Sequence, residues 1–254
     1  MENRLYLWAA RLPATIQSSS WRDRIVGALR HALPQACTLC SGAAGVALIC
    51  DPCSQSLAAL GPACPCCALP VSSGLICGKC SGKCPAFDAT QAAFTYAYPI
   101  DRLIQAYKYN GALSLAGWFA EAMLARRTHP VSQIGADVMV AMPLSRARQS
   151  ERGFNHALEI ARVLSRRSGI ALGTRAVTRR RDTPAQATLP WSERESNVRG
   201  AFGCTSDVAG RSVIVIDDVM TTGASLDELA RTLKRGGARR VENWIVARTL
   251  PPRD

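Results

Sequence analysis

The stretch that decides the fold reads Val213-Ile-Val-Ile-Asp217-Asp218-Val-Met-Thr221-Thr222-Gly223-Ala-Ser225. The apolar run over residues 211–216 predicts a strand buried in a parallel sheet, and two adjacent carboxylates follow at its carboxyl end. A small, hydroxyl-rich loop with a glycine comes next, and then a helix that begins near Ser225 and stops before Gly236. Open α/β sheets bind ligands at this end of their strands, so the stretch also predicts a site.

The loop after the two acids has the composition of a phosphate site. Backbone N–H groups of such a loop, at the positive end of the helix dipole, favour a bound phosphate. Thr221, Thr222 and Ser225 would add hydroxyl donors, whereas the Gly-Lys-[Ser/Thr] element of a Walker A loop is absent. A phosphate beside two acids predicts a phosphorylated sugar, its hydroxyls bound by Asp217 and Asp218 with Mg²⁺ nearby. The alternative is an ordinary helix N-cap after a strand that ends in acids.

Strands and helices alternate from about residue 87 to the end of the chain. Strands are expected over residues 93–98, 137–142 and 241–247, and helices over residues 101–109, 113–127, 155–167 and 226–235. This alternation predicts βαβ units and a parallel sheet. The polar stretch Thr178–Arg199 lacks periodicity and is expected to form a long mobile loop.

Ten of the eleven cysteines lie between Cys37 and Cys84, and eight of these ten form two copies of one pattern offset by 27 residues. Each copy contains two Cys-x-x-Cys pairs separated by nine residues, with Leu-Ile directly before the third cysteine. The paired cysteines are Cys37, Cys40, Cys50 and Cys53 in the first copy and Cys64, Cys67, Cys77 and Cys80 in the second.

Pairs of this kind place two thiolates on one turn, at a spacing suited to tetrahedral zinc. We expect the eight cysteines to hold two structural zinc ions, because a short module with few large apolar residues needs a metal to fold. An iron–sulfur site and redox-active dithiols are the alternatives. The spacing leaves open whether the pairs bind sequentially or crossed, and Cys66 and Cys84 would be spare thiols.

Composition narrows the class of protein. The 254 residues, 48% of them hydrophobic, suit one domain of ordinary size with a smaller module. Arginines spread through residues 1–34 interrupt any signal peptide, and no apolar run reaches the length of a membrane span, so a cytoplasmic protein is expected. A short amphipathic helix is expected near Trp21–Arg30. The net charge of +12 favours anionic partners. The alternative is that arginine is simply the favoured basic residue of a GC-rich genome.

Further motifs occur in one order along the chain, at residues 107–111, 143–148, 151–155 and 186–202. With these motifs the chain resembles the ComF family of bacterial competence-related proteins, whose members join a zinc module to a phosphoribosyltransferase domain. The stretch 213–225 is similar to the signature by which type I phosphoribosyltransferases bind phosphoribosyl pyrophosphate (PRPP). The resemblance implies an amino-terminal amphipathic segment over residues 1–34, a double four-cysteine zinc module over 35–86, and a parallel-sheet α/β phosphoribosyltransferase domain over 87–254.

The resemblance also implies roles for individual residues. Asp217 and Asp218 would be the catalytic pair, and PRPP would be bound by Thr221, Thr222, Gly223, Ala224, Ser225, Arg146, Arg148 and Lys108. The two arginines would face the pyrophosphate from a loop after Met142, with helix capping and surface charge as the alternative. For Lys108 the alternative is an exposed lysine. Residues 178–200 match a flexible hood that closes over the site, where Arg179–Arg181 would bind pyrophosphate or a DNA backbone.

Family membership implies a role in DNA uptake or in the use of external DNA, with phosphoribosyl transfer from Mg²⁺–PRPP to an unidentified acceptor. A second hypothesis is a competence factor that binds single-stranded DNA and keeps the PRPP site as a non-catalytic sensor or relic. The zinc module would then dock DNA or a partner such as a competence helicase, and a homodimer stays open. The chain is only 6% aromatic and offers few stacking platforms for single strands. A PRPP-responsive transcription regulator is disfavoured because no helix-turn-helix segment is visible.

Overall fold

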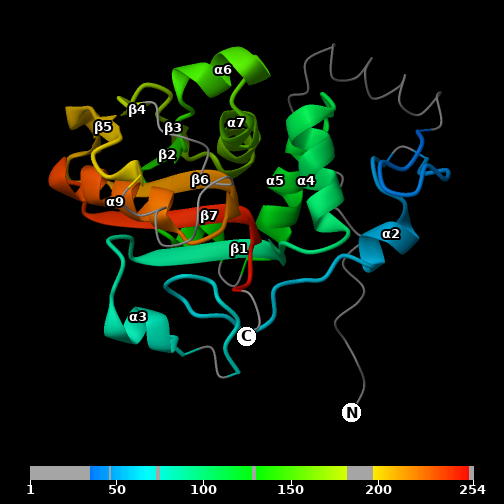
Figure 1. Ribbon diagram of the computed structural model, residues 1–254, viewed down its shortest axis with the longest axis horizontal. Helices are drawn as coiled ribbons and strands as arrows, with labels where there is room; N and C mark the ends of the chain where they lie inside the picture. The colour runs from blue at the N-terminus through cyan, green and yellow to red at the C-terminus, as the bar shows by residue number, and fades with distance from the viewer. Residues whose placement is uncertain (1–34, 46, 73–74, 128–129, 182–196, 252–254) are drawn as a thin grey trace. The chain divides into compact units, whose positions relative to one another are not determined.

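A computed structural model of the chain describes residues 35–45, 47–72, 75–127, 130–181 and 197–251. Within these residues the chain forms two compact units, one ending at Asp51 and the other beginning at Pro52. The α/β fold belongs to the second unit (Figure 1). The amphipathic helix predicted near Trp21 lies outside the described residues.

The second unit contains a five-stranded parallel sheet and a separate pair of antiparallel strands. In chain order the described elements are α2 (Asp51–Gln55), α3 (Gly78–Gly82), β1 (Ala89–Thr95), α4 (Ile100–Tyr109), α5 (Leu115–Ala125), η2 (Val131–Gln133), β2 (Val138–Ala141), α6 (Arg146–Arg152), α7 (His156–Ser168), β3 (Ala171–Leu172), β4 (Val177–Arg179), β5 (Phe202–Cys204), η5 (Ser206–Val208), β6 (Ser212–Met220), α9 (Ala224–Arg235) and β7 (Arg240–Arg248).

The strand order β1-β7-β6-β2-β3 puts β6 at the centre of the sheet, paired in parallel with β7 and β2. The connections from β1 to β2 and from β2 to β3 run in one direction across the sheet, and the connection from β6 to β7 runs in the other. Because parallel crossovers are right-handed, α5 and α7 cover one face and α9 covers the opposite face (Figure 1). This is the predicted parallel-sheet α/β fold.

The core is centred on β6 and β7. Val213, Ile214, Val215 and Ile216 are at most 1% exposed. Two polar side chains that enter this core donate hydrogen bonds: the Trp244 Nε1–H donates to Glu242 Oε1 at 2.8 Å, and the Asn243 amide donates to Thr90 Oγ1 at 3.1 Å. Strands buried on both faces need continuous apolar runs, which explains why this part of the sequence was decisive.

Helix α7 confirms the boundaries predicted from its sequence. Asn155 is its N-cap, with Oδ1 accepting a hydrogen bond from the Leu158 N–H at 3.2 Å. Gly169 ends the helix at φ 76°, in the left-handed conformation that glycine adopts without strain.

No helix among the described residues combines the length and the apolar character that crossing a bilayer requires.

Several predicted boundaries were wrong where pairing overrides local pattern. Strand β6 continues to Met220, beyond the predicted end, because its register with β7 persists up to the pair Met220↔Arg248. The two acids therefore lie within the strand. Strand β1 begins at Ala89 and ends at Thr95, and the strands β4 and β5 were not predicted at all. Strand β4 occupies the start of the expected loop at 178–199, and residues 182–196 of that loop lie outside the described part.

The central strand gives a direct test of this core. Ile214→Ala removes a fully buried side chain (0% exposed) from β6 and should lower the free energy of unfolding by about 2–5 kcal/mol, from lost burial and the cavity left behind. Urea denaturation measures the change. Leu250→Ala is the matched control, since Leu250 is 37% exposed and should change stability by less than about 0.5 kcal/mol. Equal effects of the two substitutions would contradict the placement of β6 in the core.

Candidate functional site

The two acids lie in the last four residues of β6, at the carboxyl edge of the sheet. Both neighbouring strands support this edge: the Met142 N–H donates to Ile216 O at 2.9 Å, and Asp217 is in register with Ile245 of β7. After Met220 the chain turns and α9 begins at Ala224. The structure therefore brings the acids and the predicted phosphate loop, residues 221–225, to one edge of the sheet.

The turn depends on Gly223, which has φ 86°. A side chain there would be strained, and its Cβ would lie 2.6 Å from Met220 Cε. Thr222 Oγ1 accepts a hydrogen bond from the Ala224 N–H at 3.2 Å, which fixes the first turn of α9. The loop thus has the tight backbone that the sequence predicted for a phosphate site.

Lys108, in the last turn of α4, reaches the acids. Its Nζ lies 2.9 Å from Asp218 Oδ2, and the two side chains are only 18% and 14% exposed. The sequence nominated Lys108 as an anion ligand but gave no sign of this pairing, because α4 and β6 are more than 100 residues apart. The ion pair means that the lysine belongs to the same site as the acids.

Asp217 has an unusual proton affinity. Burial, followed by the charge of Asp218, raises the pKa of Asp217 from 3.8 to about 7, against the opposing effects of the Asp218 N–H, Lys108 and Arg148. The Asp218 N–H donates to Asp217 Oδ1 at 2.9 Å. Two adjacent carboxylates with one titrating near neutrality are typical of a functional site, since nothing in a structural core requires them.

The arginines predicted in a loop after Met142 lie instead in the short helix α6. Ser145 caps this helix, with Oγ accepting a hydrogen bond from the Arg148 N–H at 3.3 Å. The prediction of an open loop was therefore wrong, because a serine at this position satisfies a helix N-terminus. Arg148 remains close enough for its charge to lower the pKa of Asp217. The Arg146 side chain is outside the described part of the chain.

Tyr107 and Asn155, which lie in the motifs 107–111 and 151–155, and His156, which the sequence did not single out, position the elements around the site. The Asn155 side-chain amide donates to Met142 O at 3.0 Å, which ties α7 to the end of β2. The buried Tyr107 hydroxyl donates to the His156 carbonyl at 2.8 Å, and the His156 ring Nε2 lies 3.0 Å from the Tyr107 carbonyl. Tyr107 precedes Lys108, so this reciprocal pair fixes the turn of α4 that carries the lysine.

The ends of the predicted hood are joined by one arginine. Arg181 donates through Nη2 to the carbonyls of Asn197 at 3.1 Å and Arg199 at 2.7 Å. This arginine was predicted to bind pyrophosphate or DNA, and here it bridges the two chain segments that flank residues 182–196. Arg179 lies over the Phe202 ring at 5.4 Å. Closure of the hood remains a prediction, since those intervening residues are not described.

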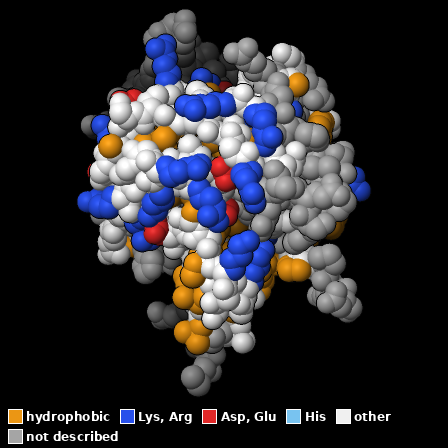
Figure 2. All heavy atoms as spheres, turned by 60° about the vertical axis from the view of Figure 1, so that its left-hand side comes forward, with side chains coloured by type: hydrophobic (Ala, Val, Ile, Leu, Met, Phe, Trp, Pro, Cys, Tyr) orange, Lys and Arg blue, Asp and Glu red, His pale blue; other side chains and the backbone are white. Residues whose placement is uncertain are grey.

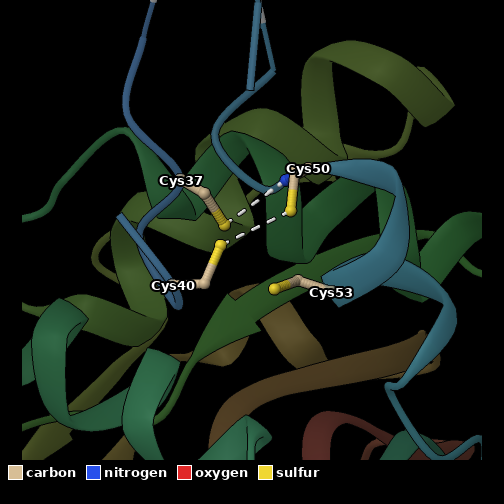
Figure 3. Close-up of side chains that lie close together, drawn as sticks. All are labelled: Cys37, Cys40, Cys50 and Cys53. Atoms are coloured by element: carbon tan, nitrogen blue, oxygen red, sulfur yellow. Dashed lines mark hydrogen bonds between the residues drawn. The ribbon is translucent and has the colours of Figure 1, made fainter. Parts of the chain in front are cut away.

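The eight predicted cysteine ligands form two clusters. One contains Cys37, Cys40, Cys50 and Cys53 and the other Cys64, Cys67, Cys77 and Cys80, each with all its sulfur atoms within 4.8 Å of one another. The four sulfur atoms of the first cluster point toward a common centre (Figure 3). The pairs therefore combine sequentially along the chain, which resolves the alternative of a crossed arrangement.

The two clusters repeat the same geometry. The Cys50 N–H donates to Cys37 Sγ at 3.4 Å, and the Cys77 N–H donates to Cys64 Sγ at the same distance. Left-handed residues recur as well, at Ser41 (φ 60°) and at the position 27 residues later, Ala68 (φ 56°). The internal repeat read from the sequence is thus a repeat of structure.

Both clusters present the four sulfur donors of a closed zinc site. Burial alone would raise the pKa of Cys37, but backbone hydrogen bonds, chiefly from Cys50 and Cys40, lower it to about 6, which favours the thiolate that a metal ion binds. Four sulfur donors leave no open coordination position, so these sites are structural. Cys66 and Cys84 belong to neither cluster, and the Cys84 thiol donates to the Cys80 carbonyl at 3.2 Å.

Two known families match separate parts of the chain. Residues 151–249 match the family described as "Phosphoribosyl transferase domain", and residues 28–81 match "Double zinc ribbon domain". The second match, together with the two four-cysteine clusters, supports two zinc-binding sites in the amino-terminal part of the chain.

Relatives cover most of the chain. The "DNA utilization protein YhgH" of Escherichia coli strain K12 is 34% identical over 176 residues, 66% of this chain and 78% of that protein. "Competence protein F" of Haemophilus influenzae is 28% identical over 65% of this chain and 74% of that protein. Among solved structures, the glutamine PRPP amidotransferase of Bacillus subtilis has a TM-score of 0.38 and 19% identity, over 56% of this chain and 30% of that chain.

The clusters predict the metal content. The purified protein should contain about two zinc ions per chain, and Cys40→Ser should lower this to about one, because three ligands no longer close a tetrahedral site. Cys66→Ser is the control and should leave the content unchanged. Mass spectrometry of the metals with native intact mass gives the count. A folded preparation free of zinc would contradict the assignment.

The raised pKa of Asp217 predicts that the free energy of unfolding depends on pH. Since its pKa is about 7 in the folded protein and 3.8 ordinarily, the folded state binds more protons between about pH 4 and pH 7. The contribution of Asp217 to the free energy of unfolding therefore falls as pH rises through that window.

Asp217→Asn should remove this loss. Without Mg²⁺, urea unfolding should find the variant close to wild type near pH 4 and more stable than wild type at pH 8. Groups that titrate in both proteins cancel in the difference. A difference between variant and wild type that stays constant from pH 4 to pH 8 would show that Asp217 titrates normally.

Proposed function

The chain belongs to the ComF family of competence-related proteins, and on that premise we propose that its α/β domain binds Mg²⁺–PRPP at the carboxyl ends of β2 and β6. In this proposal the domain transfers the phosphoribosyl group to an acceptor during the utilisation of DNA. The single observation that carries it is the juxtaposition of the Asp217–Asp218 pair with the loop 221–225 at one sheet edge.

The loop supplies the phosphate end of the site. Backbone N–H groups at the start of the 12-residue helix α9 would bind the 5-phosphate, supported by the positive end of the helix dipole. Gly223 allows the loop to turn tightly, and the hydroxyls of Thr221 and Ser225 would add donors. A phosphate held here leaves the sugar beside the carboxyl end of β6.

The two carboxylates would bind the ribose hydroxyls. Their oxygens are also donors that suit Mg²⁺, which when bound would neutralise charge on the departing pyrophosphate. Asp217 accepts hydrogen bonds best as the anion, so its raised pKa places the gain of binding above about pH 7. Lys108 is paired with Asp218 in this structure. When the ribose hydroxyls bind the Asp218 carboxylate, the lysine ammonium would be released to pair with the pyrophosphate.

The relatives' printed names, competence and DNA utilization, support a role with DNA. Figure 2 shows many Lys and Arg side chains on the face that carries α9. Those of α9, β7 and the turn between them are largely paired with carboxylates within 4.0 Å: Arg231 with Asp227, Lys234 with Asp88, Arg235 with Glu228, Arg239 with Asp137, and Arg240 with Glu242. Paired cations attract a phosphate backbone less, so the charge of this face does not by itself favour DNA binding.

Calorimetric titration of the zinc-loaded protein with PRPP tests the proposal. We expect saturable binding that requires Mg²⁺, with ribose 5-phosphate and pyrophosphate as partial ligands. The double variant Asp217→Asn/Asp218→Asn should weaken PRPP binding about 100-fold or more, since each charge-assisted hydrogen bond contributes about 1.5–3 kcal/mol. Asp207→Asn is the control, because Asp207 is exposed and precedes the opposite end of β6.

The outcomes separate the two hypotheses for the chain. Unchanged affinity in the double variant would refute the role of the acids. Absence of PRPP binding, with single-stranded DNA bound at an affinity that falls steeply with salt, would favour a DNA-binding factor in which the site is a relic. PRPP binding with loss in the double variant justifies a screen for the acceptor.

A further inference from the structure

Arg248 is the last residue of β7 and is only 2% exposed, an unusual place for a guanidinium group. It stands at the carboxyl edge of the sheet, in register with Met220 at the end of β6. The strand pattern alone would put another apolar residue here. A buried cation at this edge needs both hydrogen-bond partners and a counter-charge.

The hydrogen bonds of Arg248 join two parts of the second unit. Its Nε donates to the carbonyl of Cys67, a ligand of the second cluster, at 2.8 Å. Its Nη1 donates to the Met220 carbonyl at 2.9 Å, to the Thr249 carbonyl at 2.7 Å, and to the Thr221 carbonyl. The guanidinium group of Arg248 therefore links the Cys64–Cys67 turn of the second cluster to the start of the phosphate loop at Thr221.

A counter-charge for Arg248 would come from a metal-loaded second cluster. None of the ion pairs formed among the described residues involves Arg248, and its partners are neutral carbonyls. A zinc ion with four thiolates carries a net charge of about −2, which would compensate the buried cation.

Two further hydrogen bonds join the segment around the second cluster to the α/β fold. Asp227, in the first turn of α9, accepts a hydrogen bond from the Ala86 N–H at 2.6 Å, and the Thr90 N–H near the amino end of β1 donates to the Pro65 carbonyl at 3.0 Å. A cavity of about 50 Å³ lies between the cluster and the loop, with Lys79 and Gly223 among its lining residues. The second cluster and the loop 221–225 thus lie in one packed region of the second unit.

We propose that Arg248 is a positioning residue that couples the metal-loaded second cysteine cluster to the phosphate loop, so that the loop is ordered only while that cluster holds zinc. The first cluster has the same ligand spacing and should have no such effect. Binding of PRPP is part of this inference only through the proposed function. The order of the loop does not depend on it.

Hydrogen–deuterium exchange of the full-length protein tests the coupling without a ligand. Cys80→Ser and Cys53→Ser remove the fourth cysteine of the second and the first cluster, 27 residues apart, and form a matched pair. Peptides that cover residues 219–226 should exchange about tenfold faster or more in Cys80→Ser and at the wild-type rate in Cys53→Ser. Equal exchange in the two variants would overturn the proposal.

A second pair of variants isolates the guanidinium group. Arg248→Met should keep about two zinc ions yet show fast exchange in residues 219–226. Arg248→Lys should not restore slow exchange, because one ammonium cannot reach both Cys67 and the loop as a planar fork does. Wild-type exchange in a zinc-loaded Arg248→Met protein would refute the role of Arg248. If Arg248→Met does not fold, the two cysteine variants still decide whether the cluster controls the loop.

Linkage provides a readout that a merely structural residue would not move. Coupling is reciprocal for binding free energies, so PRPP with Mg²⁺ should raise the affinity of one of the two sites for zinc, measured against a competing chelator at equilibrium, by roughly 5–150-fold in wild type and not in Arg248→Met. The strengthened site should be absent from Cys80→Ser and present in Cys53→Ser. If wild type does not bind PRPP at all, the proposed function fails while the exchange experiment still tests the coupling.

Discussion

The parallel pairing of β6 between β2 and β7 is the constraint on which the rest of the structure depends. It buries the apolar residues of β6 on both faces and stops only when the strand reaches Met220. The acids Asp217 and Asp218 are therefore held by a rigid backbone at the edge where parallel strands end. The loop and α9 that follow inherit their position from the same pairing, because a short turn leaves them little freedom.

Charge at this edge is arranged at a cost to stability. Two carboxylates side by side repel each other, and the burial of Asp217 adds to that cost, which is why its pKa is raised. Lys108 offsets part of it through Asp218, and its helix is held by the reciprocal bonds of Tyr107 and His156. Arrangements that cost stability persist where chemistry needs them, which is the physical ground on which we propose the function at this edge.

The second cysteine cluster contacts the α/β domain in addition to stabilising its own segment of the chain. A small module with few apolar residues gains its stability from metal, yet the second cluster also lies against the buried Arg248. The same guanidinium group reaches the carbonyls of Met220 and Thr221, where the loop 221–225 begins. The two repeats are alike in local geometry, and the contact with Arg248 belongs to the second.

The sequence by itself determined the local parts of this protein. Apolar runs predicted the buried strands, the pattern over residues 155–167 predicted α7, and the 27-residue offset predicted two sets of zinc ligands. These features follow from neighbours along the chain, as do the glycine turn and the paired acids. The family resemblance added the phosphoribosyltransferase fold, which the parallel sheet confirms.

Tertiary structure alone decided the contacts between distant segments. The Lys108–Asp218 pair, the sequential pairing of the cysteines and the bridge made by Arg248 join residues that no local pattern connects. The length of β6 was likewise set by its register with β7, and the helix α6 replaced an expected loop. Side-chain charges and hydrogen bonds act through space, so their partners become known only when the packing of the strands has brought them together.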